Sequence, residues 1–298
     1  MKRSLGLAAL LGLAVLTACE SETKAIKGDG EQMNMSHDHH SNHGPAKTDG
    51  AEGSTHNHGG GQTGGLQEKD VNVSWTYAEG QAPEAGVDTK ITMAFTHDGK
   101  AIESFETTHE QKEHLIIVSK DLSYFHHIHP EYQGGGVFEV NNRFPAGGDY
   151  KLIADFVPEG GGAMSKSAWL QVKGAPLPAV PVKPDGERVK TVDGLRVTLD
   201  FDRLAAGQEL MLTYTIEDAE TGAPVTDLQP YLGAVGHVVI LSEDAEQYLH
   251  VHPMDEKGSG PKAEFMTTFP HAGIYKIWGQ FQRDGRVITV PFVVNVLP

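Results

Sequence analysis

Two histidine triplets in the sequence share one spacing. In each, twelve residues separate the first histidine from the second, and one residue separates the second from a third, which precedes proline. The six histidines are His114, His127, His129, His237, His250 and His252. Three imidazoles can bind one transition-metal ion when their nitrogens lie roughly 2.0–2.1 Å from it. The spacing therefore predicts one three-histidine metal site for each triplet.

Each triplet lies in a stretch that is typical of a β-hairpin, because an apolar β-branched run leads into a short polar connection and a returning strand. With the connection at 120–123, antiparallel pairing places His114 opposite His129 and Ile116 opposite His127. Side chains alternate between the faces of a strand, so the three histidines share one face. His126 should point to the other face. His126, His109 and His271 have no counterpart in the other copy of the repeat and are expected at the surface.

A segment before the hairpins, residues 19–66, has no hydrophobic periodicity and is predicted to be a disordered tether. It carries a second set of candidate ligands. These are Met33, Met35, His37, His39, His40, His43, His56 and His58. Thioethers suit soft ions such as Cu(I), and imidazoles suit copper, zinc and nickel. The composition favours metal capture over a merely solvated linker, and the Met-x-Met element tilts the choice of metal toward copper.

The first 18 residues pair Lys2 and Arg3 with a short apolar stretch, which is typical of a secretory signal peptide. The Leu-Thr-Ala-Cys sequence that ends at Cys19 resembles the lipobox of bacterial lipoproteins. That resemblance implies cleavage before Cys19, its acylation, and anchoring to the outer face of the cytoplasmic membrane. An ordinary signal peptide or an uncleaved anchor is the alternative. Cys19 is the only cysteine, so lipidation would leave no thiol for a disulfide or a blue-copper centre.

The remaining sequence consists of short alternating strand patterns that occur twice. Phe144-Pro145 and Tyr150 of the first half, for example, match Phe269-Pro270 and Tyr275 of the second. We therefore expect an all-β fold with two tandem immunoglobulin-like or cupredoxin-like sandwiches, at 67–174 and 185–298. A Pro-rich linker at 175–184 should keep the two halves apart, so that each site acts alone.

Both units resemble the YtkA-like group of extracytoplasmic β-sandwiches. The matching features are the strand that begins with histidine, the Asp-Leu-Ser at 121–123, the His-x-His-Pro ending and the Phe-Pro-x-x-Gly-x-Tyr motif. The resemblance covers both units but not the tether. It implies a sandwich fold and possible copper handling, and it assigns no enzyme activity.

These features together predict a lipid-anchored metal-binding protein, with copper as the first choice of ion and zinc as the second. It would sequester the metal or deliver it to a metal-receiving membrane protein. The formal net charge of −16 argues against nucleic acid as a partner. The alternative is a non-catalytic adhesion or pH-sensing module with structural histidines. A zinc enzyme would need a general base, but Met254 stands where the first copy has Glu131.

Overall fold

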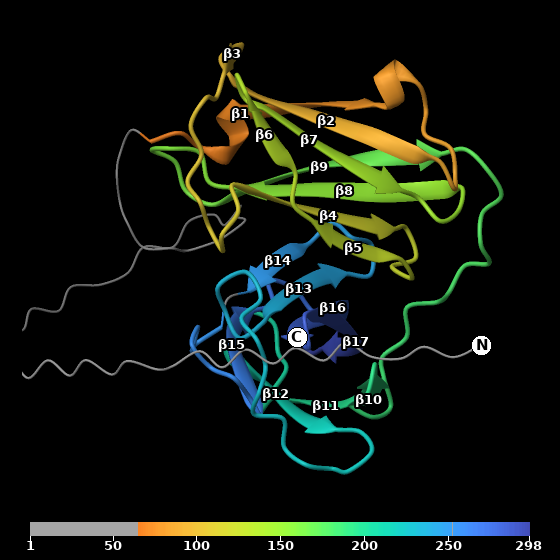
Figure 1. The fold of residues 1–298 in the computed structure, drawn as a ribbon, viewed down its shortest axis with the longest axis vertical. Coiled ribbons are helices and arrows are strands. Elements are labelled where there is room, and N and C mark those ends of the chain that lie inside the picture. Colours follow the sequence, from red (N-terminus) through yellow and green to blue (C-terminus); the bar gives the residue numbers. More distant parts are fainter. Residues whose placement is uncertain (1–64, 252) are drawn as a thin grey trace, which may run out of the picture. The chain divides into compact units, whose positions relative to one another are not determined.

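The computed structural model describes residues 65–251 and 253–298, which form two successive antiparallel β-sandwiches (Figure 1). The prediction of an all-β fold with an internal repeat is confirmed. Among the described residues, the helical elements are single 3-10 turns, η1 (Glu68–Asp70) and η2 (Ala78–Gly80). No helix in this part of the chain is long and apolar enough to cross a membrane.

The first sandwich is built from nine strands in two sheets. One sheet has the order β1-β2-β7-β6, with β3 paired to β2, and the other has the order β5-β4-β8-β9. The strands are β1 (Val71–Tyr77), β2 (Asp88–His97), β3 (Lys100–Ala101), β4 (Glu113–Ser119), β5 (Phe125–Ile128), β6 (Glu131–Gly134), β7 (Val137–Arg143), β8 (Gly148–Phe156) and β9 (Met164–Val172).

The second sandwich repeats this plan with four strands in each sheet. The orders are β10-β11-β12-β15 and β14-β13-β16-β17. The strands are β10 (Val189–Val192), β11 (Leu195–Asp200), β12 (Glu209–Asp218), β13 (His237–Ser242), β14 (Tyr248–Val251), β15 (Lys262–Thr268), β16 (Gly273–Arg283) and β17 (Arg286–Val296). The short strands β3, β6 and β10 were not predicted, because they are too brief to show a period-2 pattern.

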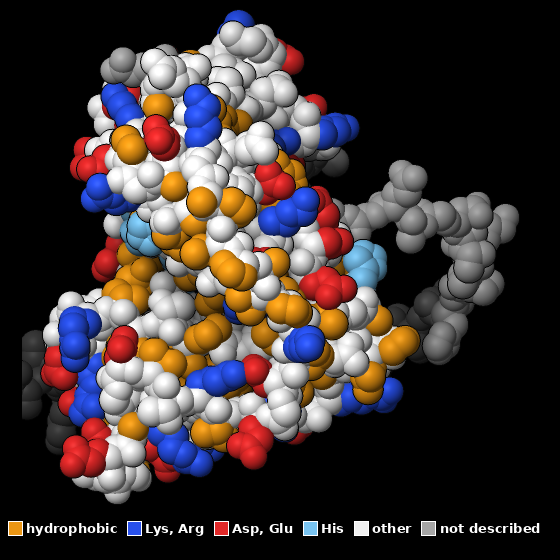
Figure 2. Space-filling model, turned by 90° about the vertical axis from the view of Figure 1, so that its right-hand side faces the viewer, with side chains coloured by type: hydrophobic (Ala, Val, Ile, Leu, Met, Phe, Trp, Pro, Cys, Tyr) orange, Lys and Arg blue, Asp and Glu red, His pale blue; other side chains and the backbone are white. Residues whose placement is uncertain are grey.

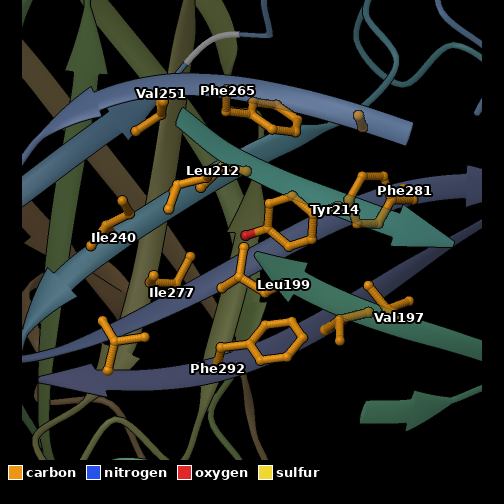
Figure 3. Packing of buried hydrophobic residues seen from close by; sticks show 14 of the residues in the cluster. Val197, Leu199, Leu212, Tyr214, Ile240, Val251, Phe265, Ile277, Phe281 and Phe292 are labelled. Atoms are coloured by element: carbon orange, nitrogen blue, oxygen red, sulfur yellow. The ribbon is translucent and has the colours of Figure 1, made fainter. Parts of the chain in front are cut away.

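Each sandwich has its own apolar core between its two sheets. In β2 the inward residues Ile91, Met93 and Phe95 are completely buried, while the residues between them are partly exposed. Figure 3 shows the equivalent packing in the second sandwich, where Leu199 and Tyr214 meet Phe292 from the opposite sheet. Burial of such side chains contributes about 25 cal/mol per Å² of apolar surface, and this term holds the two sheets together.

A third apolar cluster joins the two sandwiches. Strands β4 and β13 are buried on both faces: Leu115 and Ile117 enter the first core, whereas Ile116 and Val118 meet side chains of the second sandwich. Val239 and Leu241 of β13 and Trp278 of β16 belong to the same cluster, and the Phe125 and Trp278 rings stack with centroids 4.6 Å apart. The prediction that the linker keeps the two halves apart is therefore wrong.

Candidate metal centre

The β4–β5 hairpin has the predicted register. Ile116 pairs with His127 across the hairpin, and His114 lies two residues before Ile116 on the same strand. His129 follows the last residue of β5, and Pro130 comes next, where a residue without an N–H can end the ladder. Alternation places the three histidines on the face of the sheet that carries Ile116, which is the face turned toward the second sandwich.

The first triplet forms a compact cluster. One nitrogen from each of His114, His127 and His129 lies within 4.8 Å of the other two. The ring centroids are 5.3 Å apart for His114 and His127, 5.0 Å for His114 and His129, and 4.8 Å for His127 and His129. His114 is 1% exposed and His127 is 8% exposed. The hairpin therefore brings together three imidazoles that are largely shielded from solvent, as the spacing predicts.

Hydrogen bonds orient two of these rings. Nε2 of His114 donates to the backbone oxygen of Thr108 at 3.0 Å, and Nδ1 of His127 donates to Oε1 of Gln280 at 2.7 Å. Nε2 of Gln280 donates to Oγ1 of Thr289 at 3.3 Å, which turns the amide oxygen of Gln280 toward His127. Because both partners of the histidines are acceptors, each ring must carry its proton on the nitrogen that faces its partner.

The two remaining nitrogens of these rings face each other. Nδ1 of His114 lies 3.1 Å from Nε2 of His127. In neutral rings with the tautomers just assigned, both atoms carry a lone pair and neither has a hydrogen to donate. Two lone pairs at this distance repel unless a cation lies between or beside them. Either a shared proton or a metal ion satisfies this arrangement.

His129 supplies a third lone pair. Its Nε2 is buried and has no hydrogen-bond partner among the described residues. Burial lowers the pKa of His129 from 6.5 to about 4, so the ring is neutral at neutral pH. A neutral imidazole nitrogen without a proton is the form that binds a metal ion.

The second triplet is described only in part. His237 begins β13 and is 1% exposed, and the backbone of His250 pairs with Val239 as His127 pairs with Ile116. The side chain of His250 and the whole of His252 lie outside the described residues. The same is true of Cys19, the signal peptide and the tether ligands. A second three-histidine site, the lipid anchor and the metal-capturing tether therefore stay predictions.

Two further histidines belong to this region in a way that the spacing did not reveal. The ring centroid of His237 lies 6.2 Å from those of both His114 and His127, although His237 belongs to the other sandwich. His109, expected at the surface, is half-buried with its centroid 4.7 Å from His237. Its φ of 49° and the φ of 64° at Glu110 indicate a strained turn, which no sequence pattern predicts.

The histidines without a role in the predicted sites lie elsewhere. His126 is exposed, and its Nδ1 lies 2.9 Å from Oδ1 of Asn142, on the face opposite to His127, as predicted. His271 is also exposed and uses its backbone oxygen to accept a hydrogen bond from Tyr275. On the face in Figure 2, histidine atoms occupy only small areas, and acidic and basic side chains are interspersed.

Two carboxyl groups, one buried and one half-buried, lie beside the cluster. Glu113 is 0% exposed, and neither of its carboxyl oxygens has a hydrogen-bond partner among the described residues. Burial, and secondarily the charge of Asp155, raise the pKa of Glu113 well above its ordinary value. Asp155 of β8 pairs with His114 of the neighbouring strand β4, and it accepts a 2.8 Å hydrogen bond from the Tyr248 hydroxyl of the second sandwich. The region thus combines imidazoles with acidic groups and contains little water-exposed surface.

Both halves of the chain match one sequence family. It is described as a domain of unknown function, DUF8832, and the matches cover residues 67–174 and 190–297, which is more than half of the chain. The chain belongs to the DUF8832 family. Each sandwich is one DUF8832 domain, so the internal duplication is a tandem pair of family members. No curated protein matches the sequence at a significant level.

Solved structures resemble the DUF8832 pair only distantly. A mutant of Salmonella alpha-2-macroglobulin matches 78% of this chain with 15% identity and a TM-score of 0.27, and the match spans 15% of the macroglobulin chain. The bacterial integrin-binding protein invasin matches 76% of this chain and 39% of its own, with 13% identity and a TM-score of 0.22. Likenesses at these TM-scores carry no conclusion about what the DUF8832 pair binds.

Proposed function

We propose that this protein binds a transition-metal ion through His114, His127 and His129. The observation that carries the proposal is the pair of ring nitrogens of His114 and His127, 3.1 Å apart, whose opposite nitrogens are hydrogen-bonded to Thr108 and Gln280. Histidines that bind metal usually donate their other N–H to a carbonyl or carboxyl oxygen, which fixes the tautomer and the ring orientation.

Copper is the first choice of ion and zinc the second. Imidazole nitrogens suit both metals, and no thiolate is needed for either. The nitrogens of the three histidines lie within 4.8 Å of one another, so small rotations of the rings bring all three to about 2.0–2.1 Å from one ion. His129 has a pKa of about 4, so protons compete only weakly with the metal at this ligand.

The proposed role is sequestration or delivery rather than catalysis. An enzyme needs room for substrate beside its metal, whereas His114 and His127 are 1% and 8% exposed. His129 is the most exposed of the three ligands, so an ion would enter or leave on its side of the site. A buried site exchanges its ion slowly, which suits a protein that holds metal until a partner receives it.

The cellular setting remains part of the proposal. Acylation of Cys19 would tether the DUF8832 pair to the outer face of the cytoplasmic membrane, and the His/Met-rich segment would pass ions to the folded site. A metal-receiving membrane protein is the proposed partner. The resemblance to the YtkA-like group supports this setting through the motifs that both units share.

Isothermal titration with Cu(II) and Zn(II) tests the proposal. The protein is the full-length chain in which the eight tether ligands are replaced by alanine, called the tether variant below. We expect His129→Ala in this background to weaken binding by more than about 100-fold, the upper end of the loss seen when a supporting residue is removed. His126→Ala is the matched control, because His126 lies next to His127 and is exposed on the other face.

The outcomes separate the candidate roles. Retained affinity in His129→Ala, or equal losses in the two variants, contradicts the proposed site. A tether variant that binds neither metal but changes conformation with pH would point instead to a sensing or adhesion module.

A further inference from the structure

His237 lies among histidines of the other domain. It starts β13 of the second sandwich and is 1% exposed, yet its ring centroid is 6.2 Å from those of His114 and His127. His109, also from the first sandwich, packs edge-to-face against it with centroids 4.7 Å apart and an interplanar angle of 89°. The ring of His237 therefore lies close to the first triplet.

The ring separations can be compared with those of imidazoles that share one ion. With metal–nitrogen bonds of about 2.05 Å, two bound imidazoles have ring centroids roughly 4.5 Å apart at a right angle at the metal, about 5.2 Å apart at the tetrahedral angle and at most about 6.4 Å apart. The three pairs within the first triplet lie between 4.8 and 5.3 Å, and His237 lies 6.2 Å from two of its members. His237 is not one of the residues whose ring nitrogens already lie within 4.8 Å of one another, and its ring must move roughly 1 Å closer to reach the tetrahedral spacing.

The second sandwich already supports the first triplet in another way. Gln280 of β16 accepts the hydrogen bond that fixes His127, although the two residues are 153 positions apart in the chain. Gln280 pairs with His237 across β13 and β16, so one pair of neighbouring residues supplies both contacts. The apolar cluster of Ile116, Val239 and Trp278 holds the two faces together beside them.

We infer that His237 is a ligand of the same ion as His114, His127 and His129, so that metal binding clamps the two DUF8832 domains together. This inference rests on the proposed function. It replaces two independent sites, which the repeated spacing suggests, with one four-histidine site between the domains. Four nitrogen ligands complete the tetrahedral shell that zinc favours. Separation of the domains would remove His237 and Gln280 at once, which gives a route for metal release.

Zn(II) binding to the tether variant tests the inference. We expect one tight equivalent, and His237→Gln should weaken it at least about 30-fold, within the range by which metal-site substitutions lower affinity. X-ray absorption at the zinc edge should show four imidazole ligands, and one fewer in His237→Gln. His271→Gln is the matched control, because His271 is an exposed histidine of the same domain. The melting temperature without metal shows whether each variant folds.

Hydrogen exchange of the same proteins tests whether the metal ion holds the two domains together. Zinc should slow exchange in both hairpins, β4–β5 and β13–β14, and in His237→Gln it should slow exchange in β4–β5 only. A folded His237→Gln variant with unchanged affinity overturns the inference and leaves the proposed function intact. So does a stoichiometry of two, with one equivalent lost and the other unaffected. No zinc or copper binding to the tether variant at all contradicts the proposed function itself.

Discussion

Lys151 and Lys276 occupy equivalent positions in the two sandwiches, and the side chain of each reaches the other sandwich. Nζ of Lys151 donates to the backbone oxygen of Ala245 at 2.7 Å, and Nζ of Lys276 donates to that of Leu122, also at 2.7 Å. Both acceptors lie in the connection of the partner domain's histidine hairpin, at φ values of 59° and 55°. The domain interface is therefore nearly two-fold symmetric, like that of a homodimer formed within one chain.

Replacing either lysine by methionine should destabilise the protein by about 1.5–3 kcal/mol, the usual contribution of a hydrogen bond from a charged donor. Methionine keeps most of the apolar stem, so the loss reports on the ammonium group. The two effects should not add, because both lysines hold one interface. Urea unfolding of the single and double variants measures this. Lys173→Met, at an exposed position, is the control. Equal losses of stability at all three positions would contradict the role of Lys151 and Lys276 in the domain interface.

Glu113→Gln should make the metal-free protein more stable at neutral pH. Burial and the nearby Asp155 raise the pKa of Glu113 in the folded state. The folded protein therefore keeps a proton that the unfolded chain loses above its ordinary pKa of 4.5, and stability falls as pH rises. The difference in free energy of unfolding between the variant and the unmodified protein should grow by at most about 1.4 kcal/mol per pH unit. It should vanish near pH 4. Melting curves in EDTA test this, and parallel pH profiles would contradict it.

His129→Gln should change the pH dependence in the opposite direction. Burial lowers the pKa of His129 to about 4, whereas the unfolded ring titrates near 6.5. Between these values the unfolded chain binds a proton that the folded protein does not, so stability falls as pH drops from about 6.5 to 4. The variant should lack this loss. Melting temperatures in EDTA at pH 7, 5.5 and 4 measure the difference, with His126→Gln as the control.

Cys19→Ala should release the protein from the membrane fraction or leave it unprocessed. The reason is the Leu-Thr-Ala-Cys sequence, in which Cys19 is the only thiol of the chain available for acylation. Fractionation of cells and the mass of the purified protein report both outcomes. A variant that remains in the membrane fraction at its mature length would contradict the lipid anchor.

Much of the fold follows from local sequence patterns. Alternation in β2, β11 and β12 reflects one core face and one solvent-facing side, and the polar connections between strands set the hairpin register. The same alternation placed His114, His127 and His129 on one face and His126 on the other. These are short-range properties, because a strand's two faces and a four-residue connection involve only neighbouring residues.

The tertiary structure alone placed the second domain against the site. The apolar runs of β4 and β13 lack alternation, which is typical of a strand buried on both faces. That pattern does not indicate which surface covers the second face. Only folding brings His237 and Gln280 to histidines that lie more than a hundred positions away in the chain. Packing between faces depends on the shapes of two assembled sheets, and residue spacing along one strand carries no information about that shape.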